Sequence, residues 1–226
     1  MKIAVVRTPG SNCDQDAFFA LQDSLGVEAR YVWHEETSLQ GFDGILIPGG
    51  FTYGDYLRGG AIAARAPVID EVRRFAADGR PVLGICNGFQ ILTEAGILPG
   101  ALVRNAERRF LCMNAHIKAV DCKSPWTRDC DGVLSIPIAH NEGRYIADDE
   151  DVRRLEGEGL VAFVYCDASG GPAEAPNGST HSIAGILNSG RNVLGMMPHP
   201  ERASSPILGG DDGLRILRGF SAANLV

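Results

Sequence analysis

A cysteine stands between two glycines in the stretch GICNG at residues 84–88. The apolar run 81–85 before Cys86 is typical of a buried strand, and the segment after it of a helix. Small residues on both sides allow a sharp strand-to-helix turn that lifts the thiol clear of a sheet and sets it at a helix N-terminus, where negative charge is favoured. Such a thiol suits nucleophilic attack, and the N–H of Asn87 can face an oxyanion. The alternative is a buried structural cysteine in a glycine-containing turn.

A candidate base stands in the stretch MPHPE, residues 197–201, directly after the apolar run 193–197. The two prolines hold the backbone out of a helix, and in extended chain residues two apart point the same way. Glu201 can therefore take the Nδ1 proton of His199 and leave Nε2 as a base toward a thiol. The alternative is a proline-rich loop with an exposed histidine. Taken with the cysteine turn, the pattern predicts a triad of Cys86, His199 and Glu201.

A glycine pair in the stretch PGGF, residues 48–51, follows a third apolar run. Gly49 and Gly50 let the backbone approach a substrate closely, and the N–H of Gly50 can complete an oxyanion hole. A phosphate cradle is the rival interpretation. The chain has no G-x-x-x-x-G-K and no G-x-G-x-x-G after its first apolar run, so no nucleotide site is predicted.

The elements that must position these residues alternate between strand and helix patterns. Strand-like runs followed by amphipathic segments predict a parallel sheet with helices on both faces. Residues 110–146 hold strand-like runs without helices between them, which indicates antiparallel strands at one edge. We expect one α/β domain covering residues 1–226. The expected strands are 2–6, 28–33, 44–48, 81–85, 111–120, 133–138, 160–165, 183–187 and 193–197; the expected helices are 13–25 (capped by Ser11 or Asn12), 67–77, 87–95, 148–156 and 211–223.

Composition narrows the classes of function. Hydrophobic residues make up 45% of the 226 residues, so a large core can form, and a net charge of −7 argues against binding to nucleic acid. No apolar run is long enough for a signal peptide or a membrane span, so we expect a cytoplasmic protein with reduced thiols. The six cysteines are widely scattered, which makes a disulfide framework unexpected. A set formed by Cys112, His116, Cys122 and Cys130 lacks the close pairing of zinc ligands, so no metal is expected.

Several blocks resemble a known family, the class I glutamine amidotransferases. The stretches GICNGFQ, PGGF and PHPE together resemble this family, and GICNGFQ and PHPE are shared by many of its members. More specific blocks resemble the branch that serves purine biosynthesis as glutaminase subunits. These blocks span nearly the whole chain: RTPGSNCDQD (7–16), PGGFTYGDYLRGGA (48–61), AHNEGRY (139–145), PNGSTHSIAGI (176–186) and PHPERASSP (198–206).

This resemblance implies a flavodoxin-like three-layer sandwich and a defined chemistry. Cys86 would attack the side-chain amide of glutamine, His199 would carry a proton to the leaving ammonia, and Glu201 would hold His199. A glutamyl thioester would then be hydrolysed to glutamate. The N–H groups of Gly50 and Asn87 would stabilise the oxyanion. The resemblance also implies substrate contacts by Gly49, Phe51, Gln90, Asn141, Gly143 and Arg144.

The resemblance implies partners as well. Ammonia would pass to a separate synthetase subunit that holds ATP and Mg²⁺ and converts formylglycinamide ribonucleotide to the amidine, with a small third subunit in the same complex. No cofactor is expected in this chain. Its first and last elements lie close to its ends, which favours the stand-alone form over a fusion. Residues 53–58 and 168–182 are the expected docking surfaces.

Two other functions share some of these features. A cysteine peptidase or small-molecule hydrolase on a similar fold would have the Cys–His pair but would not account for GSNCD, YGDYLR or the block around residues 139–145. A regulatory subunit without catalysis would not need all three triad residues. Release of ammonia from glutamine, without cleavage of peptides, would distinguish a glutaminase from the peptidase or hydrolase. Glutamine-dependent synthetase activity that persists after Cys86→Ala would support the regulatory subunit.

Overall fold

A computed structural model of the chain describes residues 1–121 and 123–223. The strands are β1 (Lys2–Arg7), β2 (Glu28–Trp33), β3 (Gly44–Ile47), β4 (Val82–Ile85), β5 (Ala101–Val103), β6 (Leu111–Ala119), β7 (Val133–His140), β8 (Arg144–Ile146), β9 (Val161–Tyr165), β10 (Ile183–Leu187) and β11 (Val193–Met196). The helices are α1 (Asp14–Phe19), α2 (Pro67–Ala77), α3 (Asn87–Glu94), α4 (Asp149–Gly157), α5 (Asp212–Leu217) and α6 (Gly219–Ala223).

The central sheet has nine strands in the order β2-β1-β3-β4-β11-β10-β9-β6-β7. From β2 to β11 every neighbouring pair is parallel, and from β11 to β7 every pair is antiparallel. The predicted α/β class, with antiparallel strands added to a parallel sheet, is confirmed. The junction between the two halves is β11, which joins the sheet beside β4 although more than a hundred residues separate them. That residues 1–226 form one domain stays a prediction.

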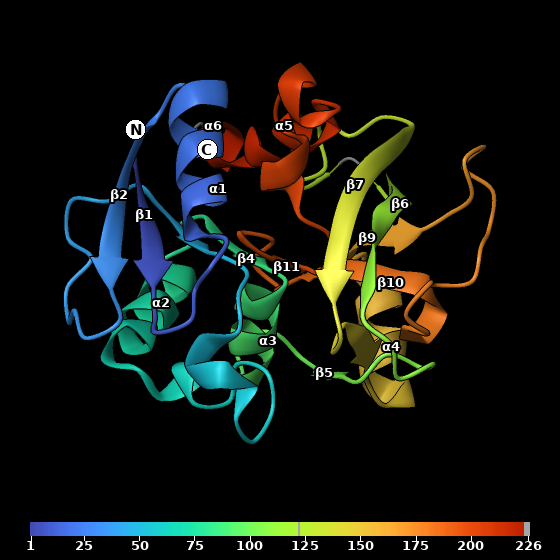
Figure 1. Cartoon of the computed structure of the whole chain (residues 1–226), viewed down its shortest axis with the longest axis horizontal. Coiled ribbons are helices and arrows are strands. Elements are labelled where there is room, and N and C mark those ends of the chain that lie inside the picture. The colour runs from blue at the N-terminus through green and yellow to red at the C-terminus, as the bar shows by residue number, and fades with distance from the viewer. Residues whose placement is uncertain (122, 224–226) are drawn as a thin grey trace.

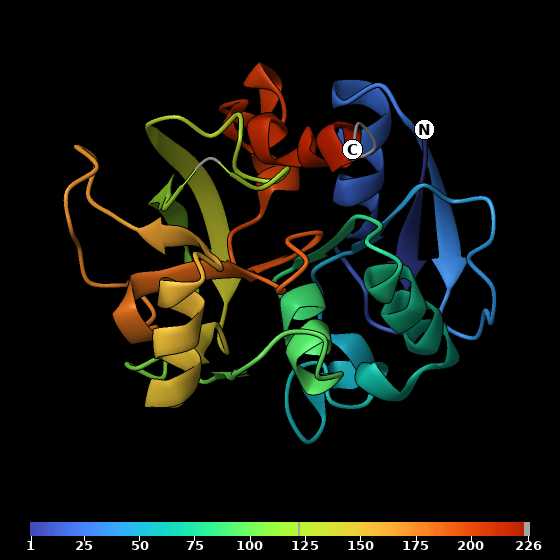
Figure 2. The same ribbon diagram turned by 180° about the vertical axis from the view of Figure 1, so that it is seen from behind.

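Helices cover both faces of this sheet (Figures 1 and 2). Helices α1, α5 and α6 lie together on one side, and α2, α3 and α4 lie along the other. Because both faces are covered, β3, β4 and β11 are buried along their whole length, as expected for the parallel strands of a layered fold. No helix in the described part of the chain is long and apolar enough to cross a membrane.

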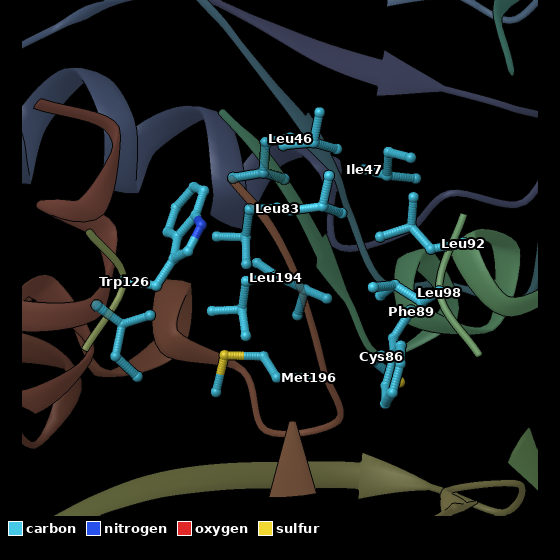
Figure 3. Packing of buried hydrophobic residues seen from close by; sticks show 14 of the residues in the cluster. Leu46, Ile47, Leu83, Cys86, Phe89, Leu92, Leu98, Trp126, Leu194 and Met196 are labelled. Carbon is cyan, nitrogen blue, oxygen red and sulfur yellow. The ribbon is translucent and has the colours of Figure 1, made fainter. Parts of the chain in front are cut away.

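The central strands of the sheet separate the hydrophobic core into two layers, one on each face. Leu46, Leu83 and Leu194 lie side by side and face Trp126, whereas Ile47 points to the other face, toward Leu92 of α3 (Figure 3). The Trp126 ring meets Phe220 edge-on at 5.0 Å between centroids, and its Nε1–H donates to the Asn192 carbonyl at 3.2 Å. This packing fixes α6 against the sheet.

Two local predictions are wrong in detail, and one small sheet was not predicted. The helix expected over residues 13–25 begins after Cys13 without a side-chain cap and continues as a π-helix, Ala20–Ser24. Ser11 Oγ accepts the Thr8 N–H at 3.0 Å instead of capping the helix. The helix expected over 211–223 is two helices, α5 and α6. The two-stranded sheet formed by β5 and β8 was not predicted, because three-residue strands leave no readable alternation.

Candidate active site

Cys86 stands in a strained turn between β4 and α3. Its backbone has φ 51° and ψ −104°, a conformation that a residue with a side chain rarely adopts. The neighbouring glycines make the turn possible, because a β-carbon at Gly88 would overlap the Ile47 carbonyl and one at Gly84 would lie 2.8 Å from Gly88 O. The Cys86 N–H donates to Met196 O at 2.8 Å, which ties the turn to β11. The strand-to-helix turn predicted from GICNG is therefore present.

His199 follows β11, the strand that runs parallel beside β4. Register pairs Met196 with Ile85, so His199 and Cys86 leave the sheet at the same edge. The His199 N–H donates to Pro137 O at 2.8 Å, which fixes the histidine to β7 as well. His199 Nδ1 lies 2.6 Å from Glu201 Oε1, and both residues are buried.

The path of the chain between these two residues differs from the one expected. Pro200–Ala203 forms a 3₁₀ turn rather than extended backbone, so the argument from alternation is wrong although the side chains do meet. The turn brings Glu201 back beneath the imidazole, and Ser204 Oγ donates to Glu201 O at 3.0 Å. The pairing thus depends on a turn that the two prolines permit.

The surroundings of His199 favour its protonated form. Burial alone disfavours the cation, but the Glu201 carboxylate and the thiols of Cys86 and Cys13 outweigh it and raise the pKa of His199 well above its usual range. His199 Nε2 has no hydrogen-bond partner among the described residues. With Nδ1 occupied by Glu201, Nε2 is the atom left to exchange a proton with a thiol.

The glycine pair that follows β3, Gly49 and Gly50, packs close to His199 and Cys86. A β-carbon at Gly49 would come within 2.8 Å of His199 Cε1, and one at Gly50 (φ 156°) within 2.6 Å of Gly10 O. The N–H groups of Gly50 and Asn87 have no acceptor among the described residues, whereas the Phe51 N–H donates to Gly10 O at 2.9 Å. Gly50 and Asn87 thus offer the two N–H groups that were predicted for an oxyanion hole.

A cavity of about 530 Å³ opens at this edge of the sheet. Cys86, His199 and Gly50 line it, together with the predicted substrate residues Phe51, Gln90 and Asn141. The amide of Gln90 is held on both sides, since Nε2 donates to Glu142 O at 2.6 Å and Oε1 accepts from Asn87 Nδ2 at 2.6 Å.

The other predicted site residues lie behind the cavity wall. Gly49, Asn87 and Glu201 support residues that line it. The Gly143 N–H donates to Asn105 Oδ1 at 3.0 Å, and Arg144 Nε donates to Gly178 O at 2.9 Å. Neither Gly143 nor Arg144 is among the lining residues, so their direct contact with a substrate stays a prediction.

The cavity also contains charged residues that were not singled out. Asp55 and Glu142 bring negative charge, and Arg104 and Arg202 bring positive charge. Arg104 Nε lies 3.6 Å from a Glu142 oxygen. Partial burial and the nearby Glu142 raise the pKa of Asp55 to about 6. Asp55, Glu142 and Arg202 lie in the blocks YGDYLR, AHNEGRY and PHPER noted above. Their place in these blocks is the sequence signal that could have marked them as residues of the site.

His140 is a further lining residue with a defined tautomer. Asn105 Nδ2 donates to His140 O and to Arg109 O, so Asn105 Oδ1 is an acceptor. It lies 3.2 Å from His140 Nδ1, which must therefore carry the proton. His140 Nε2 is then a buried lone pair without a partner among the described residues. Burial, with His199 nearby, lowers the pKa of His140 to about 4, so the ring is neutral.

The metal set considered from the sequence is not assembled in the described part of the chain. Cys112, His116 and Cys130 form no cluster with one another there, and Cys122 lies outside the described residues. Five cysteines are described, and all five are free thiols.

Comparisons with known proteins show the family of this chain. The model of the CobB/CobQ-like glutamine amidotransferase domain matches residues 1–208. A phosphoribosylformylglycinamidine synthase subunit PurQ from Thermus thermophilus is 55% identical over 97% of both chains, and one from Methanosarcina acetivorans is 48% identical over 98% of this chain and 97% of that one. A chain in the solved structure of PurLQS from Thermotoga maritima matches with a TM-score of 0.86 at 39% identity, over 97% of both chains. The resemblance inferred from the sequence is confirmed.

Proposed function

The chain belongs to the CobB/CobQ-like glutamine amidotransferase family, and on that premise we propose that it is the glutaminase subunit of a phosphoribosylformylglycinamidine synthase of purine biosynthesis. The observation that carries the proposal is the position of Cys86 and His199. They follow two neighbouring parallel strands and line the same cavity, with Glu201 on the far side of the imidazole. The identity to two PurQ subunits over almost the whole chain supports the choice of this branch.

The reaction follows from this geometry. The Cys86 sulfur attacks the side-chain carbonyl of glutamine after its proton has passed to His199 Nε2, which has no competing partner in the described part of the chain. A carbon–sulfur bond forms and the carbonyl oxygen becomes an oxyanion. When the oxyanion collapses, the carbon–nitrogen bond breaks, and the proton on His199 goes to the departing ammonia. Water then attacks the thioester, with His199 as base, and releases glutamate.

Residues at the walls of the cavity would bind the oxyanion and the glutamine. The N–H groups of Gly50 and Asn87 are the proposed oxyanion donors, and they need no reorganisation because the strained turn and Gly50 already fix them. A free amino acid carries one charge of each sign, and the cavity offers both. Phe51, Gln90 and Asn141 are the proposed contacts to glutamine, with Gly143 and Arg144 shaping the segment behind them.

The ammonia acceptor would be held by a second subunit. We propose a synthetase partner that binds ATP and Mg²⁺ and the formylglycinamide ribonucleotide, and a small third subunit in the same complex. The solved structure of PurLQS supports a complex of this kind.

Residues 53–58 form one proposed docking surface, where Tyr56 and Leu57 are 75% and 90% exposed. Residues 168–182 form the other. Alanine changes there that leave assembly intact would count against these surfaces. A cytoplasmic location stays a prediction.

The test is glutamate release from glutamine by the purified chain, alone and with the synthetase partner, ATP and acceptor. We expect partner-stimulated release that Cys86→Ala abolishes, while synthesis of the amidine from added ammonia continues with that variant. No release by the wild-type chain under any condition, with partner binding intact, would favour a regulatory subunit instead. Peptide cleavage without ammonia release would favour the peptidase alternative.

A further inference from the structure

One carboxylate in the cavity wall has no cation to balance it. Asp55 lines the cavity together with Cys86 and Gln90, and its side chain is half-buried. None of the ion pairs formed within residues 1–121 and 123–223 includes Asp55. Burial removes water from a carboxylate, and an unpaired one bears this cost without an opposite charge to offset it. The reaction derived above gives Asp55 no role.

The backbone takes an unusual path to place Asp55 in this wall. Tyr53, Gly54 and Asp55 have φ values of 53°, 68° and 53°, in the left-handed region that residues with a side chain seldom adopt. The next two residues, Tyr56 and Leu57, are exposed to solvent, whereas Asp55 lines the cavity. Backbone strain of this kind is concentrated at sites that bind or react.

The carboxylate of Asp55 also keeps most of its hydrogen-bonding capacity. Its Oδ1 accepts from Asn87 Nδ2 at 3.4 Å, which is its one hydrogen bond among the described residues. Asn87 Nδ2 gives its shorter bond, at 2.6 Å, to Gln90 Oε1. The two oxygens therefore flank one nitrogen, on the residue that follows Cys86. Because an ionised carboxylate accepts about four hydrogen bonds, Asp55 can still take a charged donor.

Glu142, the second carboxylate of the cavity, differs from Asp55 in its partners. Glu142 Oε2 accepts the Gly59 N–H at 3.1 Å, and Oε1 lies 3.6 Å from Arg104 Nε. Burial and the charge of Glu142 raise the pKa of Asp55 to about 6, as expected where two negative groups share a cavity without a cation between them. A positive group that enters the cavity is attracted by both, but Asp55 is the one that lacks a partner charge.

Glutamine carries a positive group of the right kind. In extended glutamine the ammonium nitrogen lies about 5 Å from the amide carbon, so an amide held at Cys86 leaves the ammonium group free to reach the wall beside it. We propose that the Asp55 carboxylate binds the α-ammonium group of glutamine, with Gln90 Oε1 as a second acceptor. This role rests on the proposed glutaminase function. The charge-assisted hydrogen bond makes the site specific for amides that carry the cation.

The test compares glutamine with glutaramate, the same amide without the amino group. Both are assayed on the full chain assembled with its synthetase partner, and assembly is checked for each variant. We expect the wild type to prefer glutamine in kcat/KM by about 10- to 100-fold, and Asp55→Asn to lose most of this preference through a higher KM for glutamine. Asparagine suits the test, because it adopts left-handed backbone more readily than most residues and removes only the charge. A merely structural role of Asp55 would lower the use of both amides alike.

Glu142→Gln is the matched comparison, because it removes the other carboxylate of the cavity. We expect this variant to keep most of the preference for glutamine. Loss of the preference in Glu142→Gln instead of Asp55→Asn would overturn the proposal. So would a wild type that uses both amides equally, although the proposed glutaminase function would then stand. If the complex releases no glutamate from glutamine, the proposed function itself fails and the role of Asp55 with it.

A further measurement needs no variant, in case Asp55→Asn folds poorly. Both amides depend alike on Cys86 and His199, so the ratio of their kcat/KM values isolates the ammonium group. Asp55 loses its charge as the pH falls through about 6. The preference of the wild type for glutamine should therefore decrease between about pH 7.5 and pH 5. A ratio that stays constant over this range would contradict the role of Asp55.

Discussion

Glu201 Oε1 lies 2.6 Å from His199 Nδ1, both side chains are buried, and the Glu201 carboxylate raises the pKa of His199, the proposed base. Replacing Glu201 with Gln removes the negative charge that offsets the cost of burying the imidazolium. We expect kcat for glutamine hydrolysis to fall by about 10²–10⁴-fold, as at other triads that lose their acid.

The same variant should change the pH profile. Glu201 raises the pKa of His199, so without it the imidazolium loses its proton at a lower pH. The limb of the kcat profile that reports this ionisation should therefore move toward acid in Glu201→Gln. A profile that keeps its position while kcat falls would contradict the electrostatic role of Glu201.

Gly49 is predicted to tolerate no side chain. Gly49→Ala places a methyl group 2.8 Å from His199 Cε1 and 3.2 Å from Cys13 Sγ, so the imidazole must shift. A displacement of about 1 Å costs on the order of 10²-fold in rate. The control is Gly157→Ala, where a β-carbon meets nothing within 4 Å. Equal rates in the two variants would show that the imidazole position is not critical.

His140 should make the protein sensitive to acid. Its pKa is about 4 in the native state against 6.5 for an ordinary histidine, so between these values the unfolded chain binds a proton that the native state does not. Stability is therefore lost as the pH falls through this window, by on the order of 3 kcal/mol of unfolding free energy.

Urea unfolding of His140→Gln at several pH values measures this contribution. We expect a weaker fall in stability below pH 6.5 than in the wild type. The exposed His181 supplies the control variant, His181→Gln, which should keep the wild-type dependence. If the two variants behave alike, the burial of His140 does not govern the acid response.

Asn87 is predicted to act through Gln90. Its Nδ2 donates to Gln90 Oε1 at 2.6 Å and its Oδ1 accepts the Thr52 N–H at 3.2 Å. Asn87→Ala frees the Gln90 amide and leaves a buried N–H unpaired, so we expect a higher KM for glutamine and a loss of about 1–3 kcal/mol in stability. The double variant with Gln90→Ala should raise KM no further than Gln90→Ala alone. Additive changes in KM would mean that the two side chains act independently.

The sequence predicts the turn at Cys86 and the parallel half of the sheet well, because both depend on local signals. The apolar runs of β1, β3 and β4 are bounded by glycine, proline or polar residues, and small residues mark the turn at Cys86. His199 and Glu201 were predicted as neighbours for a reason that the 3₁₀ turn contradicts. The prediction that the side chains of His199 and Glu201 meet is nevertheless confirmed, because the 3₁₀ turn also brings them together.

What the sequence leaves open depends on contacts between distant segments. Nothing near Val193–Met196 indicates that this strand enters the sheet between β4 and β10. Cys13 reads as an ordinary residue at a helix start, and only the folded chain brings it to His199 across 186 positions. The neutral tautomer of His140 likewise depends on Asn105, whose amide is oriented by carbonyl groups of two other segments.

The position of β11 beside β4 also bears on when the enzyme becomes active during its synthesis. The ribosome releases β1 to β4 and the thiol of Cys86 long before it makes residues 193–201, which supply both a central strand and the proposed base. A nascent chain therefore holds the proposed nucleophile without its proton acceptor, and its sheet lacks the strand between β4 and β10. The proposed chemistry can begin only once this last central strand has been made.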